Sequence, residues 1–177
     1  MFVRISRIFF IISMFTVVSC FNAHSQQNES LYLQGLNAAK SGNLDFAFIN
    51  FHAFLNSHSG SAKVEPVTFT IGEYYFLTKN YRDAFSIFNK FINKYPDSKA
   101  RPFAFAYLMK IGEIYAKEEF VENIKKEIVT FKQVGLLFSN FKEYVYRSLS
   151  FKEYKLVYFI DKAKFYINGE LFSEIPY

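Results

Sequence analysis

Cysteine, histidine, glycine and tryptophan are all scarce in this sequence. Its 177 residues include one Cys, three His, seven Gly and no Trp. A single Cys excludes an intramolecular disulfide, and no two His residues have the HExxH spacing of a zinc site. The chain also lacks a glycine-rich phosphate loop and a GxSxG nucleophile elbow. We therefore expect a protein that uses no metal or cofactor and is not an enzyme.

The net charge of the chain is also small. The formal net charge is +5, and it falls to +3 if a leader containing Arg4 and Arg7 is removed, since no acidic residue precedes Cys20. Such a balance gives no reason to expect a nucleic-acid partner, and no small-molecule substrate is evident. Hydrophobic residues make up 51% of the chain and charged residues 21%, which is enough for a buried core and argues against global disorder.

The N-terminus has the pattern of an export signal. A short basic region, "MFVRISR", precedes the apolar run "IFFIISMFTVV", which is too short to span a membrane but suits a signal-peptide core. The letters "VVSC" that end at Cys20 resemble the lipobox of bacterial lipoproteins, and this resemblance implies lipidation of Cys20 after cleavage. We predict a signal peptide over residues 1–19 and a lipidated Cys with a polar tether over residues 20–28. The alternative is an ordinary cleaved signal peptide in which the Cys has no role.

A repeated pattern follows the tether. "IGEYYFLTKNYRDAFSIFNKF" begins at residue 71, and "IGEIYAKEEFVENIKKEIVTF" begins at residue 111. The recurring letters are those of packing residues rather than of reactive groups. In the first of these segments the pattern consists of Gly72, Tyr75, Ala84, Phe88 and, a little later, Pro96. These residues and their spacing resemble the tetratricopeptide repeat, in which two antiparallel helices pack through small residues at their crossing.

Two further copies can be aligned with this unit. Subtracting 37 places Gly35, Ala47 and Phe51 on the positions of Gly72, Ala84 and Phe88. Adding 40 places Gly112 and Tyr115 on the positions of Gly72 and Tyr75, although no Pro closes this unit and a shifted pairing of its second helix is open. We therefore predict a mainly α fold: a tetratricopeptide-like solenoid of about three helical hairpins over residues 29–134, with a small β-hairpin at the C-terminus.

The second unit and the lipobox together resemble two groups of periplasmic tetratricopeptide proteins. In the second unit, the residues that carry this resemblance are Tyr81, Ala84, Phe88, Phe91, Tyr95, Pro96 and Ser98. One group is the lipoprotein component of the outer-membrane β-barrel assembly machinery, and the other is the coordinator of the Tol-Pal system. The resemblance implies a lipid-anchored adaptor that faces the periplasm and binds other envelope proteins or peptides. Phe21 and Asn22, which follow the Cys, include no Asp, and this favours the outer membrane. The alternative is a scaffold for cell-wall or Tol-Pal-like machinery.

The resemblance also implies a place for a protein partner. In this fold the first helix of each hairpin lines a concave groove, which suits an extended or helical peptide. The residues predicted to face the groove are Tyr32, Leu36, Phe69, Glu73, Phe76, Met109 and Glu113. The competing interpretation is that several of them are simply buried against neighbouring helices. Glu73 and Glu113 each follow a repeat glycine, which makes them the leading candidates for partner contact.

The last part of the chain, residues 135–177, has a different pattern. "FKEY" occurs twice, at residues 141–144 and 151–154, which predicts one continuing helix or two short ones. Asn168-Gly169 lies between two apolar stretches and predicts a β-hairpin within residues 155–175. We expect this segment to cap the last repeat. An enzymatic site here would have to use Asp161, Glu170 and Glu174, which no activated nucleophile or base accompanies.

Overall fold

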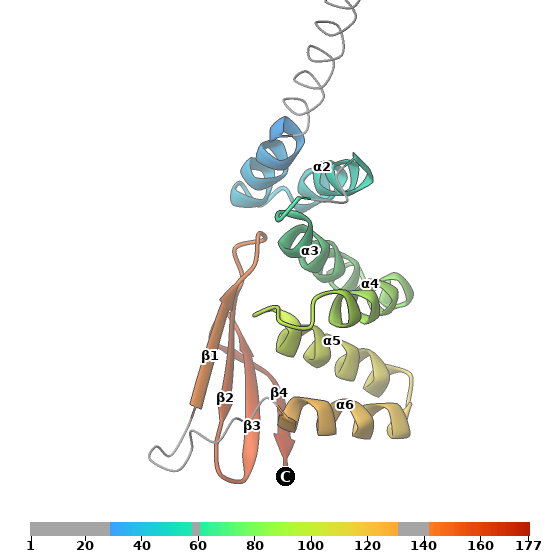
Figure 1. Ribbon diagram of the computed structural model, residues 1–177, viewed down its shortest axis with the longest axis vertical. Helices are drawn as coiled ribbons and strands as arrows, with labels where there is room; N and C mark the ends of the chain where they lie inside the picture. The colour runs from blue at the N-terminus through green and yellow to red at the C-terminus, as the bar shows by residue number, and fades with distance from the viewer. Residues whose placement is uncertain (1–28, 58–60, 131–141) are drawn as a thin grey trace, which may run out of the picture.

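The computed structural model describes residues 29–57, 61–130 and 142–177, and these form a helical layer with a sheet beside it (Figure 1). The first helix covers residues 29–40. The other described helices are α2 (Leu44–Ser57), α3 (Val64–Leu77), α4 (Tyr81–Lys94), α5 (Arg101–Ile114) and α6 (Glu118–Thr130). From α2 onward, each of these helices contacts the next along the chain. Six described helices agree with the predicted mainly α fold of about three hairpins, while the tetratricopeptide-like solenoid stays a prediction.

The second helix of each pair begins after the same backbone turn. Leu44, Tyr81 and Glu118, the first residues of α2, α4 and α6, lie 37 residues apart. A left-handed residue occurs two positions before each of them: φ is 80° at Gly42, 61° at Lys79 and 51° at Ala116. Only the first of these turns has glycine at this position, and glycine is the residue type that adopts positive φ without a steric cost. Packing of the two helices that flank each turn therefore determines its conformation more strongly than the residues of the turn do.

Hydrogen bonds confirm the 37-residue period and correct the alignment of the third pair. The N–H of Asn80 donates to the Tyr75 carbonyl at 2.8 Å, and the N–H of Lys117 donates to the Gly112 carbonyl at 2.9 Å. Gly112 therefore occupies the place of Tyr75. The offset of 40 had predicted that it would occupy the place of Gly72, and that prediction is wrong. The two "IGE" segments are alike in letters but lie three residues out of register in the fold.

The same correction applies to two more residues of the third pair. Met109 takes the position of Gly72. Tyr115 takes the position of Thr78, since these two residues cap the C-termini of α5 and α3. Tyr115 therefore ends a helix at the surface and does not repeat the packing role of Tyr75.

Two glycines make room for aromatic rings of the following helix. A Cβ atom on Gly35 would lie 2.5 Å from the Phe51 ring, and one on Gly72 would lie 2.7 Å from the Phe88 ring. Such separations are far below van der Waals contact, so any larger residue would displace a buried ring. Phe88 in turn stacks on Tyr107 of α5 with ring centroids 4.7 Å apart. The Gly–Phe contact thus closes one pair and joins it to the next.

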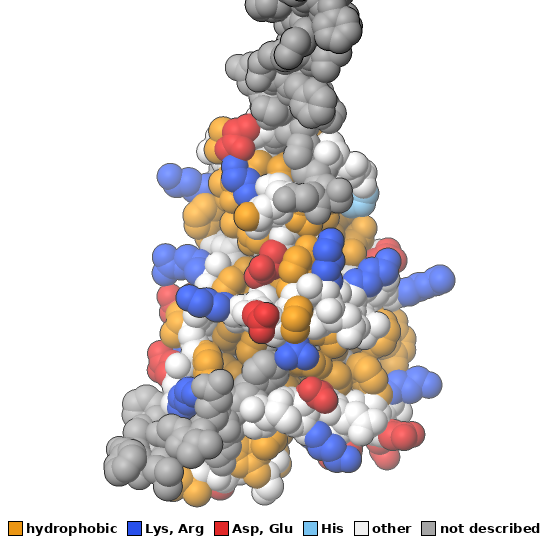
Figure 2. Space-filling model, in the orientation of Figure 1, with side chains coloured by type: hydrophobic (Ala, Val, Ile, Leu, Met, Phe, Trp, Pro, Cys, Tyr) orange, Lys and Arg blue, Asp and Glu red, His pale blue; other side chains and the backbone are white. Residues whose placement is uncertain are grey.

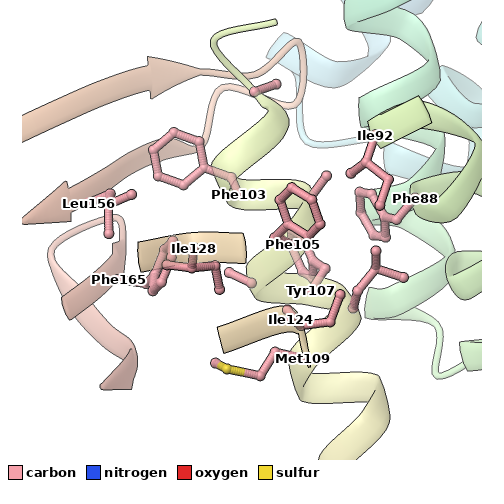
Figure 3. Close-up of a cluster of buried hydrophobic side chains, with 14 of the residues drawn as sticks. Phe88, Ile92, Phe103, Phe105, Tyr107, Met109, Ile124, Ile128, Leu156 and Phe165 are labelled. Carbon is pink, nitrogen blue, oxygen red and sulfur yellow. The ribbon is translucent and has the colours of Figure 1, made fainter. Parts of the chain in front are cut away.

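Buried side chains form two clusters. The smaller cluster belongs to the first helix, α2 and α3, and includes Phe51, Phe54 and Val67. The larger cluster belongs to α3–α6 and to the sheet, as the close approach of Phe103, Ile128, Leu156 and Phe165 in Figure 3 shows. The sheet is therefore part of the main core and not an appended module.

The C-terminal segment is a four-stranded antiparallel sheet with the order β1-β2-β3-β4. Its strands are β1 (Lys142–Arg147), β2 (Glu153–Tyr158), β3 (Lys162–Ile167) and β4 (Glu170–Pro176). The predicted hairpin is confirmed as β3 and β4, where Asn168 and Gly169 have φ of 52° and 84°, as a type I′ turn requires. The helical interpretation of the two "FKEY" segments is wrong. Side chains of β1 alternate between half-buried and exposed, the period of two that a half-buried strand needs.

The sheet lies along one side of the helical layer (Figure 1). Phe69 of α3 contacts Tyr146 and Tyr154, with ring centroids 5.3 and 5.5 Å apart. The hydroxyl of Tyr158 donates to the Ile128 carbonyl of α6 at 2.7 Å. The segment therefore reaches the last helix pair, as a cap would, but it also covers helices of the earlier pair.

Candidate partner-binding surface

The predicted groove is occupied by the protein's own sheet. Phe69 and Met109 are 0% exposed and Glu73 is 1% exposed. The prediction that these three residues contact a partner is therefore wrong for this structure, and the competing interpretation, burial against neighbouring elements, is correct for them. Phe76 is half-buried and packs edge-on against Tyr107 and Phe172. The physical reason is that β1, β2 and β4 supply aromatic rings that pack against Phe69 and Phe76 of α3.

The other predicted groove residues lie apart from one another. Tyr32 and Leu36 are half-buried on the first helix, where Tyr32 packs against Phe51 and Phe54. Glu113 is exposed near the end of α5 and pairs with Lys110 at 2.9 Å. Glu73 and Glu113 therefore have different surroundings, as the three-residue shift between their helices requires. A partner role for Tyr32, Leu36, Phe76 and Glu113 stays a prediction.

The predicted repeat residues are placed as follows. Gly35, Ala47, Phe51, Gly72, Ala84, Phe88 and Gly112 are buried, Tyr75 is half-buried, and Pro96 and Tyr115 are exposed. Pro96 lies just beyond the end of α4. The predicted signal peptide, Cys20 and the tether lie outside the described residues, as do residues 131–134 of the predicted repeat region.

Glu73 fastens the turn between β1 and β2 to α3. Its Oε1 atom accepts hydrogen bonds from Ser148 and Ser150, both at 3.0 Å, and from the hydroxyl of Tyr154. The Nζ atom of Lys152 lies 3.9 Å away. Burial raises the pKa of Glu73 above its ordinary value, while Lys152 and the three hydroxyls oppose that shift. A single carboxylate thus binds three side chains of a segment some 75 residues later in the chain.

The surroundings of Glu73 favour a structural role over a catalytic one. Tyr154 also shares a hydrogen bond with Tyr107, whose hydroxyl lies 2.7 Å away. Burial raises the pKa of both tyrosines, so neither is prepared to lose its proton near neutral pH. Within residues 29–57, 61–130 and 142–177, no cluster of three or more His, Cys, Asp or Glu side chains could hold a metal ion.

An open apolar hollow of about 320 Å³ lies between α4, α5 and α6. It is lined by Phe85, Ile111, Gly112, Tyr115, Lys117 and Phe120. The rings of Phe85 and Phe120 lie 5.5 Å apart on α4 and α6, and Tyr115, which is 53% exposed, lies beside Tyr81. A hollow of this size is at the lower end of the range for ligand pockets and is large enough for an aromatic side chain.

At the hollow, Gly112 stands where the preceding pair has Tyr75, and Ile111 stands where it has Tyr74. At the equivalent junction between α2 and α3, Phe48 takes the position of Phe85. Its ring stacks on Tyr74 at 4.2 Å and meets Tyr75 edge-on at 5.2 Å. Sequence reasoning missed this site because the offset of 40 treated Gly112 as a packing glycine. Only an offset of 37 reveals that a tyrosine has been replaced by glycine.

Charged side chains of both signs are interspersed over the face seen in Figure 2. No helix among the described residues is long and apolar enough to cross a membrane.

Comparison with known proteins gives a family. Residues 24–150 match the model of the family YfiO, which is described as outer membrane lipoprotein. A search of curated proteins found no match. The matched region contains every described helix and extends through β1 into the turn that carries Ser148 and Ser150. Since the match covers more than two thirds of the sequence, the chain belongs to the YfiO family of outer membrane lipoproteins.

Proposed function

We propose that this protein is a lipid-anchored, non-enzymatic adaptor in the assembly of envelope proteins, and that it binds a partner through the hollow between α4, α5 and α6. Membership of an outer membrane lipoprotein family supports the cellular role. The hollow supports the location, because the face that would line a groove is already covered by the sheet. Cys20 would carry the lipid, as the lipobox-like letters indicate.

The proposed occupant is an aromatic side chain of a partner protein that also carries an acidic group. Tyr75 fills the equivalent place at the α2–α3 junction, so the hollow has the lining that an aromatic ring contacts elsewhere in this fold. Lys117 lines the hollow and offers a cation to a nearby carboxylate. Partly exposed aromatic residues such as Phe85 and Tyr115 are typical of surfaces that supply binding energy.

Site-specific photocrosslinking in intact envelopes tests this proposal. A photoreactive amino acid would replace Tyr115 in the full-length protein, and in a matched control it would replace Thr78, the equivalent helix cap of the preceding pair. We expect an adduct with a component of outer-membrane assembly at position 115 and little or none at position 78.

Phe85→Ala in the same chain should reduce that adduct several-fold, because it removes one wall of the hollow. Equal labelling at positions 115 and 78, or no adduct at either, would contradict the proposed surface. Adducts with peptidoglycan enzymes instead would favour the cell-wall scaffold.

A further inference from the structure

The two edges of the sheet differ in their capacity to pair. In an antiparallel sheet the backbone groups of alternate residues point to opposite sides of the strand. On β4, the N–H of Tyr177 donates to Asp161 beside β3, so Pro176 points to the outer edge. Proline has no N–H to donate, which blocks pairing at that position. β1 contains neither Pro nor Gly, and no strand among the described residues pairs with its outer edge.

The backbone groups on the open edge of β1 can be identified. The N–H of Ser148 donates to the Lys152 carbonyl at 3.1 Å, so residue 148 points toward β2. By alternation, Tyr144 and Tyr146 also point toward β2, while the N–H and C=O groups of Glu143, Val145 and Arg147 point outward. The side chains of the same three residues are exposed, on the face of the sheet away from the helices.

The outward row Glu143–Val145–Arg147 is complementary to itself. If a second β1 strand runs antiparallel with Val145 opposite Val145, each Glu143 faces an Arg147 of the other copy. All three outward residues of each strand then oppose outward residues, so each pair can exchange two backbone hydrogen bonds. Moving the register by two residues removes one of these pairs and places charges opposite Val145. The symmetric register is therefore the one that satisfies both the backbone and the charges.

The neighbouring strand extends this complementarity. Within one copy, Arg147 pairs with Glu153 at 3.1 Å and Glu143 pairs with Lys155 at 3.1 Å. Across the symmetric edge, negative and positive charges would alternate over four strands. The order is Glu153 and Arg147 of one copy, followed by Glu143 and Lys155 of the second copy. Opposite charges across strands stabilise a sheet and like charges destabilise it.

We propose that two copies of this protein associate through their β1 edges, in antiparallel orientation about Val145, to form one continuous eight-stranded sheet. This interface is separate from the hollow between α4, α5 and α6. It is short, so we expect a weak dimer in solution that is favoured where the protein is concentrated. Covalent trapping is accordingly the most direct measurement.

Disulfide trapping of the full-length protein in detergent tests the register. In Val145→Cys the two thiols would be directly opposite, within the Cα separation that a disulfide permits. In the matched control Glu143→Cys, on the same face of the same strand, the two thiols would lie about 13 Å apart along the strands. We expect a covalent dimer from Val145→Cys, far above the levels from Glu143→Cys and from the unsubstituted chain with Cys20 alone.

Charge exchange tests the chemistry independently of folding. Glu143→Arg and Arg147→Glu each place like charges opposite one another in a homodimer, so each variant alone should dissociate at least about tenfold more readily. Mixing the two variants restores both opposite-charge pairs, and heterodimers should form at the unsubstituted affinity. Rescue on mixing cannot arise from misfolding of either chain.

Several outcomes would overturn the proposal. They are equal trapping at positions 143 and 145, trapping of position 145 to a different protein only, and no rescue in the mixed sample. A chain that stays monomeric at high concentration in detergent and gives no disulfide dimer from Val145→Cys in membranes would do the same.

Discussion

The two junctions between helix pairs repeat the same turns and helix starts, but different side chains meet at them. At the first junction Tyr75 packs against Phe48 and contacts both buried clusters. At the second junction the equivalent residue is Gly112, and an open hollow lies beside it. A repeated scaffold can therefore leave an open hollow beside Gly112 and fill the equivalent place with Tyr75, because the turns and helix starts that define the scaffold do not depend on that side chain.

Opening the first junction should have the largest effect on stability. We expect Tyr75→Gly to lower the free energy of unfolding by about 3 kcal/mol, because it removes a ring shared by two clusters and places glycine inside a helix. The measurement is urea unfolding followed by circular dichroism. Tyr115→Ala, at an exposed helix end, is the control and should change the stability by less than about 0.5 kcal/mol. Similar losses for the two variants would mean that the first junction is not closed by Tyr75.

The two glycines should respond differently to an added methyl group. A Cβ atom on Gly72 would lie 2.7 Å from the fully buried Phe88 ring, so Gly72→Ala should cost about 2 kcal/mol through overpacking. In Gly112→Ala the methyl group would lie 2.8 Å from Val121 and 2.9 Å from Phe120, and Phe120 borders the hollow. The Phe120 ring can move into that space, whereas the buried Val121 has less room to shift, so we expect a cost of about 1 kcal/mol, smaller than that of Gly72→Ala. A larger loss for Gly112→Ala in the same denaturation assay would show that the second junction is rigid.

The smallest expected effect is on the pH dependence of stability. It arises from Glu73 on α3, and α5 has no equivalent carboxyl group. Glu73 is buried beneath the sheet, whereas the residue 37 positions later is Lys110, which is partly exposed. Burial raises the folded-state pKa of Glu73, so the folded protein binds its proton more tightly than the unfolded chain does. The stabilisation from this site is complete below the ordinary carboxyl pKa, and it is lost as the pH rises through the folded-state pKa.

The variant Glu73→Gln should remove this dependence, because the amide cannot ionise. We expect its unfolding free energy to fall less than that of the unsubstituted chain between about pH 4.5 and neutrality. Denaturation series at several pH values give the slopes. Parallel slopes for the two proteins would exclude Glu73 as the group responsible.

Short sequence patterns predicted much of the fold. Gly35 and Gly72 pointed to close packing within the first two helix pairs, and each accommodates a phenylalanine ring of the following helix. Asn168-Gly169 predicted its hairpin because a type I′ turn needs two residues that tolerate positive φ. The "FKEY" segments misled because Phe, Lys, Glu and Tyr are acceptable in a helix, and only the longer alternation of β1 shows the period of a strand.

By itself, the sequence determined the helix pairs, the C-terminal hairpin and the resemblance to outer membrane lipoproteins, because these depend on neighbouring residues and on short spacings. Tertiary structure alone decided the 37-residue register of the third pair and the burial of Glu73. Glu73 meets Ser148 across 75 residues of sequence, and no local pattern records such a contact. The sheet covers the predicted groove because apolar side chains of the first helices and of the strands are more stable together than in water. That choice leaves the hollow beside Gly112 and the open edge of β1 as the surfaces proposed for binding.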